Sequence, residues 1–467
     1  MRGIKKLIVS DGAFYRKVLF LATPIALQSL ITIGVNMLDN LMVGSLGEVK
    51  LSAVSLANQF ITIYHILCMG IGMGASVLVS RYWGMKEREP QAAALALKKT
   101  LCIMIRLTVG LALVFAAATF LFPEVIMRMF TTESAVIPMG IRYFRYSIFT
   151  YFFLGLSLTC TIVLRSVGQV RIPLIVSVGA FVINLGANYI LIYGKLGLPR
   201  MEVAGAALGT LLARIFEAGV ICGYLLFREQ HIGFRLKHLC MNTKDLLREY
   251  IRISIPVLIS DGILALGNAA VAMVIGRLGV TFVAANSITG VTQQMSTVLI
   301  QGVSQAGAIV TGQTLGEGNK DKAMKQGYGF LGMGIGLGAL SALFVVAVSG
   351  LIIHSYRVSD ETMEIAYQLM NAISLILVFQ ATNSIMTKGV LRGGGDTKLL
   401  MLTDNIFLWV LSIPLGILAG FVFNLPAFAI YICLKFDQIA KAFWCVFRLR
   451  GGKWIKKISV GKRQCKE

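Results

Sequence analysis

The chain has 467 residues, of which 56% are hydrophobic and 14% are charged, and its mean hydropathy is +0.76. These values exclude an ordinary soluble domain and indicate an integral membrane protein. The net charge of +22 does not indicate a nucleic-acid-binding protein, because the basic residues are spread over the loops and are not gathered on one soluble domain. We therefore expect the lipid bilayer as a partner and no nucleic acid.

Twelve apolar runs of about 20 residues or more are each long enough to cross about 30 Å of hydrocarbon as an α-helix. We predict an all-α integral membrane protein, because a β-barrel would show short alternating strands instead. The predicted spans are 16–43, 51–80, 95–121, 139–163, 172–193, 203–227, 253–275, 282–312, 327–353, 364–389, 399–421 and 425–447.

The distribution of basic residues predicts the orientation of these spans. Of the 44 Lys and Arg residues, 32 lie in the terminal segments and the loops on one side of the predicted topology. Because cytoplasmic loops carry the excess of basic residues, we place both termini in the cytoplasm. The basic N-terminal stretch runs into a full-length span without a small-residue cleavage site, so we expect no signal peptide. No cysteine falls in a predicted outer loop, so we expect no disulfide framework.

An internal repeat organises the chain. The stretch from Thr23 to Gly84 returns without a gap, as Pro24 and Pro256 (256 − 24 = 232) and Gly84 and Gly316 (316 − 84 = 232) show. Since each copy has six spans, both copies start on the same side of the membrane, and we predict two six-helix bundles related by a pseudo-two-fold axis along the membrane normal.

The repeat also divides the chain. We expect an N-terminal lobe at 1–227, a cytoplasmic linker at 228–252, a C-terminal lobe at 253–447 and a basic cytoplasmic tail at 448–467. Within the linker, Asn242 or Thr243 is a plausible helix cap.

Polar residues recur at helical spacing inside several spans and would not be tolerated against lipid. Each stripe is explained either by hydrogen bonds between helices or by a hydrated cavity, and matching stripes in both lobes favour a central cavity. The stripe residues that we expect to line a substrate cleft are Gln28, Thr32, Gln59, Gln293 and Gln301.

Three aspartates, Asp39, Asp261 and Asp404, lie well inside predicted spans, where each costs about 2.5–3.5 kcal/mol on insertion scales. They are either structural carboxylates that accept hydrogen bonds, or a site for a proton or a cation. An ionised Asp39 could offer oxygen ligands to Na⁺ together with an amide such as Asn36. We interpret two further groups as structural because their charges can neutralise one another: Arg214 with Glu217, and Lys435 with Asp437 and Lys441.

Signatures of soluble enzymes are missing. The sequence contains no G-x-x-x-x-G-K-[ST] motif, and its glycine-rich runs lack a βαβ context and suit close helix packing. It also has no His or Cys pattern typical of a metal enzyme. We therefore expect a transporter driven by an ion gradient, without enzymatic activity, bound cofactor or resident metal.

Several stretches carry a family resemblance. Pro24 to Gly47 with Asp39, VLRSVGQVRIP at 163–173, GVLRGGGDTK at 389–398 and the connection 184–210 together resemble a multidrug and toxic compound extrusion (MATE) transporter of the bacterial multidrug:cation antiporter type. The resemblance implies two six-helix bundles around a central cleft, and the exchange of cytoplasmic amphipathic or cationic compounds for external Na⁺ or H⁺. It places Asp39 where many members have an aspartate tied to coupling, and it ranks Asp39 first.

The sequence departs from the family pattern at two carboxylates. Asn188 stands where some members have an acid in helix five, and Asn383 stands where another branch has an acid in helix ten, so we add both amides to the candidate cleft residues. Asp261 lies about one turn from the expected coupling glutamate of helix seven, and Asp404 resembles an aspartate of a subset of members. The resemblance therefore leaves Na⁺ and H⁺ both open.

Two other functions compete with drug export by a monomeric antiporter. A flippase for a lipid-linked precursor would be expected to line its cleft with Arg and Lys, to match a diphosphate. A channel fits less well, because a tight duplication suits two lobes that alternate access. The twin arginines Arg165 and Arg392 are expected to bind helix-terminal carbonyls and lipid headgroups and to serve folding.

Overall fold

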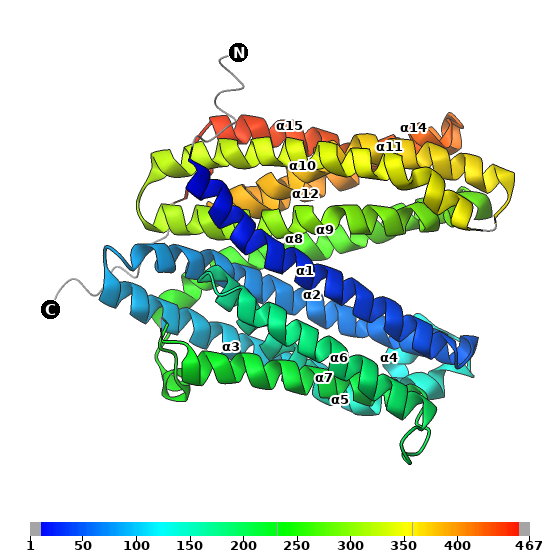
Figure 1. The fold of residues 1–467 in the computed structure, drawn as a ribbon, viewed down its shortest axis with the longest axis horizontal. Coiled ribbons are helices and arrows are strands. Elements are labelled where there is room, and N and C mark those ends of the chain that lie inside the picture. Colours follow the sequence, from blue (N-terminus) through cyan, green and yellow to red (C-terminus); the bar gives the residue numbers. More distant parts are fainter. Residues whose placement is uncertain (1–10, 231, 357, 457–467) are drawn as a thin grey trace. The chain divides into compact units, whose positions relative to one another are not determined.

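The structure, a computed structural model, describes residues 11–456 apart from 231 and 357 (Figure 1). The described chain consists of helices and their connections, and it contains no β-strand. The N-terminal segment 1–10 and most of the predicted basic tail, from residue 457 onward, lie outside the described residues. The predicted all-helical fold class is confirmed.

The helices of the first copy of the repeat coincide with the first six predicted spans. One short helix, α4, was not predicted, and the last span ends in a π-helical turn. The elements are α1 (Gly12–Gly44), α2 (Glu48–Met85), α3 (Pro90–Leu121), α4 (Pro123–Phe130), α5 (Val136–Ser166), α6 (Arg171–Tyr193), α7 (Val203–Gly223) and the π-helical turn Tyr224–Arg228.

The second copy also follows the predicted spans, but its last three spans are less regular. Spans ten and eleven contain π-helical turns, and span twelve is broken at Lys435. The elements are α8 (Lys244–Arg277), α9 (Val280–Gly316), α10 (Lys320–Ser355), α11 (Asp360–Ser384) continuing as Ile385–Leu391, α12 (Thr397–Ile406) continuing as Phe407–Ser412, α13 (Ile413–Ile417) continuing as Leu418–Val422, α14 (Ala427–Leu434) and α15 (Phe436–Arg450).

Ten of the described helices are long and apolar enough to cross a membrane. The two remaining spans are α9, which carries a long polar stripe, and the pair α14 and α15, which is too short in each half. The helix α8 begins at Lys244, inside the linker predicted at 228–252, and the Asn242 side chain accepts a hydrogen bond from the Lys244 N–H at 3.2 Å, as expected of the predicted cap.

The repeat is visible in the helix boundaries. α1 and α8 start at equivalent positions, Gly12 and Lys244 (244 − 12 = 232). Each is followed by a glycine with positive φ, 108° at Gly47 and 116° at Gly279, which turns the chain into the next helix.

Later in each copy the offset becomes 227 residues. Arg165 and Arg392 (392 − 165 = 227) end their spans, and each is followed by a glycine at φ 85°, Gly168 or Gly395 (395 − 168 = 227). The same offset extends to α7 and α15, where Arg214 and Lys441 (441 − 214 = 227) are equivalent. Positions up to Gly84 are therefore compared at an offset of 232 residues, and positions from Arg165 onward at an offset of 227 residues.

The chain forms two compact units. One unit comprises Leu27–Trp83 and Glu89–Leu258, and the other comprises the described chain from Ile259 onward together with Gly84–Arg88 and the part of α1 up to Ala26. The divisions inside α1 and α8 are equivalent, after Ala26 and Leu258 (258 − 26 = 232), two residues beyond the proline of each helix.

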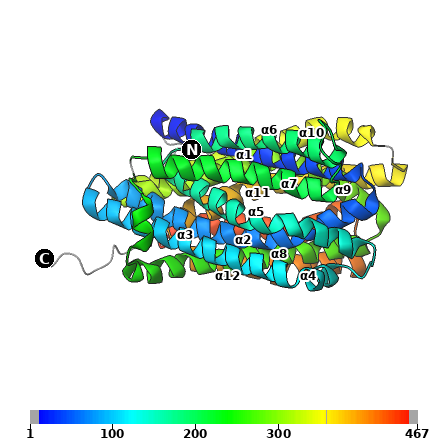
Figure 2. The same ribbon diagram turned by 90° about the horizontal axis from the view of Figure 1, so that it is seen from below.

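Each unit has its own apolar core. In the first unit, α5 packs against α3 and α7, and the three helices run lengthwise beside one another in both views (Figure 1, Figure 2). Its core includes Val43, Ala57, Phe144, Ile192 and Ala207. In the second unit, α11 runs alongside α10, and the core includes Val274, Phe282, Leu369, Leu377 and Tyr431. The polar side chains described below therefore lie on helices fixed by apolar packing on their other faces.

Candidate functional site

Asp39 of α1 faces α6, where Asn188 donates a hydrogen bond from Nδ2 to Asp39 Oδ1 at 2.6 Å. Asn188 is buried, and the same Nδ2 lies 3.4 Å from Asn184 Oδ1 one turn earlier on α6. Within the described chain, Asn188 Oδ1 is buried without a hydrogen-bond partner, and no Lys, Arg or His nitrogen lies within 4 Å of the Asp39 carboxylate. Asp39 is thus an embedded acid that is held by an amide and not by a cation.

Gly209 of α7 makes room for this amide. A Cβ atom at Gly209 would lie 2.1 Å from Asn188 Oδ1 and 3.1 Å from the Asn188 backbone nitrogen, so any larger residue would displace the side chain. The close approach of α6 and α7 therefore positions Asn188 against Asp39.

The cation on α7, Arg214, is bound to a residue other than Asp39. Arg214 Nη1 is 2.6 Å from Glu217 Oε2 of the same helix, as predicted from their spacing. The charge of Arg214 acts electrostatically on Asp39 and on His65 of α2, although it makes no ion pair with either. The first copy therefore brings Asp39, His65 and the Arg214–Glu217 pair into one neighbourhood.

Gln28 of α1 is a buried cross-link. Its Oε1 accepts from Nε of Arg165 at 3.0 Å and also from Nη2 of that residue, and its Nε2 donates to Ser177 Oγ at 2.7 Å. Thr32, one turn later, donates to the Gln28 carbonyl oxygen at 3.0 Å. Gln28 thus ties α1 to α5 and α6.

Asp261 of α8 is paired with an arginine. Its Oδ1 lies 3.3 Å from Arg392 Nη2, and the Arg392 side chain is 7% exposed. The expected anchoring of Arg392 at lipid headgroups is wrong, because the buried guanidinium binds a carboxylate of a neighbouring helix. Both twin arginines reach the first helix of their own copy, Arg165 through Gln28 and Arg392 through Asp261.

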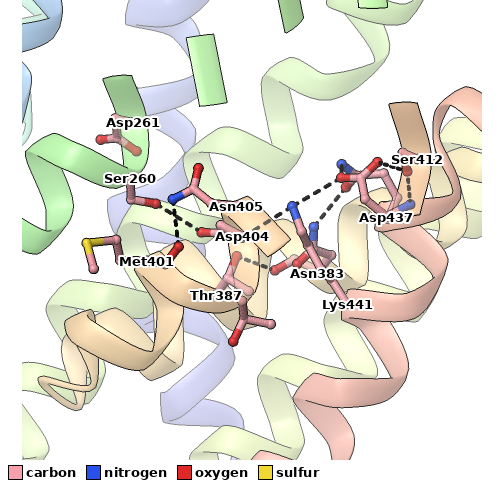
Figure 3. A network of polar contacts seen from close by, with 12 residues as sticks. Ser260, Asp261, Asn383, Thr387, Met401, Asp404, Asn405, Ser412, Asp437 and Lys441 are labelled. Atoms are coloured by element: carbon pink, nitrogen blue, oxygen red, sulfur yellow. Dashed lines mark hydrogen bonds and ion pairs between the residues drawn. The ribbon is translucent and has the colours of Figure 1, made fainter. Parts of the chain in front are cut away.

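Asp404 of α12 belongs to a network of charges (Figure 3). Its Oδ1 lies 3.4 Å from Lys441 Nζ, and its Oδ2 accepts from Ser260 Oγ at 3.4 Å. The same Lys441 Nζ lies 3.1 Å from Asp437 Oδ2. The ion pair predicted between Lys441 and Asp437 is confirmed, and it includes Asp404 as well.

Two other candidate amides of the second copy are bound to neighbouring side chains. Asn383 Nδ2 donates to Gln438 Oε1 at 2.8 Å. Gln293 of α9 donates to Gln380 Oε1 at 3.1 Å and accepts from the Tyr431 hydroxyl at 3.0 Å, so its amide connects α9, α11 and α14. Both of its polar ends are thus used by the protein itself.

The four remaining candidates are exposed, and the other exposed residues of their helices are mostly apolar. These candidates are Thr32, Asn36, Gln59 and Gln301.

The two copies carry different chemistry at equivalent places. The counterpart of Asp39 is Val271 (271 − 39 = 232), and the counterpart of Asn188 is Leu415 (415 − 188 = 227). Val271 is buried in the apolar core of its unit. The sequence alone did not reveal that Asn188 binds Asp39 or that Gly209 makes room for Asn188. The 227-residue offset was the available signal, because it allows the residues of α6 and α7 to be compared with the equivalent residues of the second copy.

The contacts of Gln28 have a counterpart as well. Gln28 and Ser177 correspond to Ser260 (260 − 28 = 232) and Asp404 (404 − 177 = 227), and each pair is joined by a hydrogen bond. Duplication has therefore kept this contact between the first and fifth spans of each copy and changed its residues.

Comparison with known proteins identifies the family. The MatE family matches the chain twice, at residues 24–190 and 256–418, which start at the two equivalent prolines. The chain is 24% identical to a probable multidrug resistance protein NorM of Thermotoga maritima over 97% of this chain and 96% of that protein, and 26% identical to the multidrug resistance protein NorM of Burkholderia vietnamiensis over 87% of each.

Solved structures agree with this assignment. A crystal structure of a MATE P26A mutant matches with a TM-score of 0.84 at 18% identity, over 97% of this chain and 99% of that one. The likeness extends over both copies and shows the fold, with twelve spans in two bundles. From these matches and from its two repeat copies, the chain belongs to the MatE family of membrane transporters.

Proposed function

We propose that this transporter is a multidrug efflux antiporter that exports amphipathic or cationic organic compounds in exchange for Na⁺ or H⁺ by alternating access. The observation that carries the proposal is the state of Asp39: it is embedded in a span, it is bound by a neutral amide, and no basic nitrogen of the described chain lies within 4 Å. Binding of a proton or a cation would stabilise a carboxylate in this setting.

The Asn188 amide suits both states of such a carboxyl group. Its Nδ2 now donates to Asp39, as an ionised carboxylate requires. A half-turn of the amide would present Oδ1 instead, which can accept from a protonated Asp39 or bind Na⁺ beside it. Because Gly209 leaves space on the far side of the amide, α7 supports this exchange of donor and acceptor.

Coupling follows from competition. The incoming cation and the outgoing compound compete for the same negative charge, or for the shape of the lobe that this charge sets, so they are not carried together. We propose Thr32 and Gln59 as substrate-facing residues of the N-terminal lobe and Gln301 as one of the C-terminal lobe, because their polar side chains are exposed. The protein would act as a monomer in the bacterial inner membrane, with both termini in the cytoplasm.

The experiment is an efflux assay with purified protein in proteoliposomes, with ethidium as a fluorescent organic cation. An imposed Na⁺ gradient at equal pH is compared with an imposed pH gradient without Na⁺. We expect ethidium movement under one of the two gradients and little under the other, which identifies the coupling ion.

Asp39→Asn is the matched variant, because it keeps the shape of the side chain and removes the charge. It should reach the membrane at normal levels and still bind some ethidium, but it should lose gradient-driven transport. Undiminished transport by this variant would rule out Asp39 as the coupling site, and no transport by the unmodified protein under either gradient would count against antiport itself.

The flippase alternative is not favoured. A flippase needs cations that are free to bind a diphosphate, whereas the embedded Arg214, Arg392 and Lys441 are each bound to a carboxylate of the protein. The relatives named above are also described as multidrug resistance proteins.

A further inference from the structure

Charged side chains meet in the second copy where its last span is broken. α14 ends at Leu434 and α15 begins at Phe436, and Lys435 stands between them. Asp437 and Lys441 follow on the first turns of α15, and both side chains are 2% exposed. Asp404 of α12 is brought to the same place (Figure 3).

Asp437 accepts hydrogen bonds from three neighbouring side chains. Its oxygens accept from Ser412 Oγ at 3.2 Å, Gln438 Nε2 at 2.7 Å and Lys441 Nζ at 3.1 Å. Its backbone N–H also donates to Ser412 Oγ at 2.6 Å, which fixes the first turn of α15 to the π-helical turn Phe407–Ser412. Three side-chain donors therefore hold the Asp437 carboxyl group in one position.

Charge is balanced within this cluster. Two acidic residues, Asp404 and Asp437, are matched by two lysines: Lys441 forms an ion pair with each of them, and Lys435 interacts electrostatically with Asp437 and Lys441. The neighbouring pair of Asp261 and Arg392 is balanced too. Cys445, one turn after Lys441 on α15, is the other titratable group near Asp404.

The repeat explains how this arrangement differs from the first copy. Lys441 corresponds to Arg214, and Asp404 and Asp437 correspond to Ser177 and Thr210 (404 − 177 = 227; 437 − 210 = 227). In the first copy the cation on the last span binds Glu217 of its own helix, and Asp39 has no ion pair among the described residues. In the second copy the equivalent cation crosses to another helix and lies between two carboxylates.

We propose that Lys441 is a built-in counter-cation, which occupies the place that a solution cation would otherwise take between Asp404 and Asp437. The second copy then exchanges no proton or metal cation during transport. If Asp39 couples transport, as the proposed function holds, each transport cycle then moves one cation, and Asp39 alone carries it. This last consequence rests on the proposed function.

The surroundings show what would happen if the ammonium were removed. Asn383 Oδ1 and Asn405 Oδ1 are both buried without a hydrogen-bond partner in the part of the chain that the structure describes. Asn383 is linked through Gln438 to Asp437, and Asn405 adjoins Asp404 in the chain. Without Lys441, two carboxylates and these oxygens would remain with Lys435 as the only ammonium of the cluster, which is a setting that attracts Na⁺ or a proton.

The test uses thermal unfolding of the purified full-length protein in detergent, between pH 6 and pH 8.5 and with NaCl or choline chloride at equal ionic strength. Three variants are compared with the unmodified protein: Lys441→Met, Asp404→Asn, and the double variant. Lys441→Met leaves one excess negative charge, Asp404→Asn leaves one excess positive charge, and the double variant is balanced again.

The proposal predicts opposite pH dependences. Relative to the unmodified protein, Lys441→Met should gain several degrees in unfolding midpoint as the pH is lowered or Na⁺ is added, because either neutralises the excess negative charge. Asp404→Asn should instead gain as the pH is raised, since loss of a proton removes its excess positive charge. The double variant should follow the unmodified protein across the whole range.

Two results would overturn the proposal. One is a Lys441→Met variant whose unfolding midpoint, relative to the unmodified protein, depends on neither pH nor Na⁺. The other is a gain in stability of the unmodified protein on addition of protons or Na⁺ that is lost in Asp404→Asn. Such a result would mean that Asp404 is itself an exchange site. If Lys441→Met does not accumulate, recovery of folded protein in the double variant supports the proposal, and equal loss in both overturns it. None of these readouts uses transport, so failure of the antiport assay leaves them unaffected.

Discussion

The two copies of the repeat share a helix plan and differ in how they treat buried charge. In the first copy, Asp39 is held by the Asn188 amide, while the cation of the last span, Arg214, is bound to Glu217. In the second copy, the counterpart of Asp39 is the buried Val271, and the counterpart of Arg214 is bound to two carboxylates. Within the described residues, Asp39 of the first copy has no ion pair, whereas Asp261, Asp404 and Asp437 of the second copy are each paired with a cation.

The helices of the second copy are also less regular than those of the first copy. Spans four and five of the first copy, α5 and α6, are regular α-helices, whereas spans ten and eleven of the second copy contain the π-helical turns Ile385–Leu391, Phe407–Ser412 and Leu418–Val422. π-helical turns often mark places where local geometry serves a side-chain contact. Here Phe407–Ser412 carries the serine that binds Asp437. Duplication therefore preserves the topology, while the buried polar contacts diverge.

The largest expected difference between the copies concerns their aspartates. Asp39→Asn should reduce gradient-driven efflux to the level of protein-free vesicles without lowering the unfolding midpoint. Asp261→Asn should instead lower stability, because it leaves the buried Arg392 without its carboxylate. Breaking a fully buried ion pair costs about 3–5 kcal/mol, and we expect less here because the Asp261 side chain is 23% exposed.

Efflux assays and denaturant unfolding of both variants in parallel check this separation. Loss of efflux in a stable Asp261→Asn variant would instead place coupling in the second copy.

The position of Asn188 can be tested without touching any polar residue. Gly209→Ala places a methyl group against Asn188 Oδ1 and should disturb the hydrogen bond to Asp39. A displaced hydrogen bond of about 0.5–1.5 kcal/mol corresponds to a reduction in efflux of about 2-fold to 10-fold. Gly219→Ala on the same helix is the matched control, because a Cβ there meets nothing within 4 Å, and its efflux should be normal. Equal efflux by the two variants would separate Gly209 from coupling.

The equivalent contacts of Gln28 and Ser260 should differ in strength. Gln28 makes three hydrogen bonds to Arg165 and Ser177, whereas Ser260 makes one long bond of 3.4 Å to Asp404. Gln28→Leu should therefore lower the free energy of unfolding by about 1–3 kcal/mol, and Ser260→Ala by less than about 1 kcal/mol. Denaturant unfolding in detergent measures both, and the reverse order would show that the two contacts are not equivalent in function.

The fold was predictable from the sequence because its signals are large. The sequence itself shows apolar runs of about twenty residues, the constant offset from Pro24 to Pro256 and the glycines of the turns. The broken twelfth span was harder to predict, since Ala427–Phe447 is apolar enough to pass for one helix, and only the network around Lys435 and Asp437 shows the break.

The candidate site was predictable in residue type and less so in pairing. Asp39, Asp261 and Asp404 stand out in apolar spans, but each is bound by a residue of another helix, and helical periodicity does not reveal such contacts. The sequence groups Asp261 and Asp404 with Asp39 as coupling candidates because all three lie inside predicted spans and because the family resemblance has acids at or near their positions. The ion pairs with Arg392 and Lys441 distinguish Asp261 and Asp404 from Asp39.

The smallest expected difference between the copies lies outside the spans. Lys50 Nζ is 2.7 Å from Glu202 Oε2, whereas the counterparts in the second copy are Phe282 (282 − 50 = 232) and Ala429 (429 − 202 = 227), which carry no charge. The hydrogen bond from Lys50 holds the pKa of the Glu202 carboxyl below its ordinary value. A lowered folded-state pKa stabilises the protein above the unfolded value of about 4.3, and this contribution is lost as the pH falls through the folded value.

Since both groups are partly exposed, Lys50→Ala should cost no more than about 0.5 kcal/mol at pH 7, and the difference from the unmodified protein should shrink below about pH 4.3. Unfolding midpoints at pH 7 and pH 4 check this, with Lys50→Arg as the control that keeps the charge, and a difference that grows in acid would contradict it.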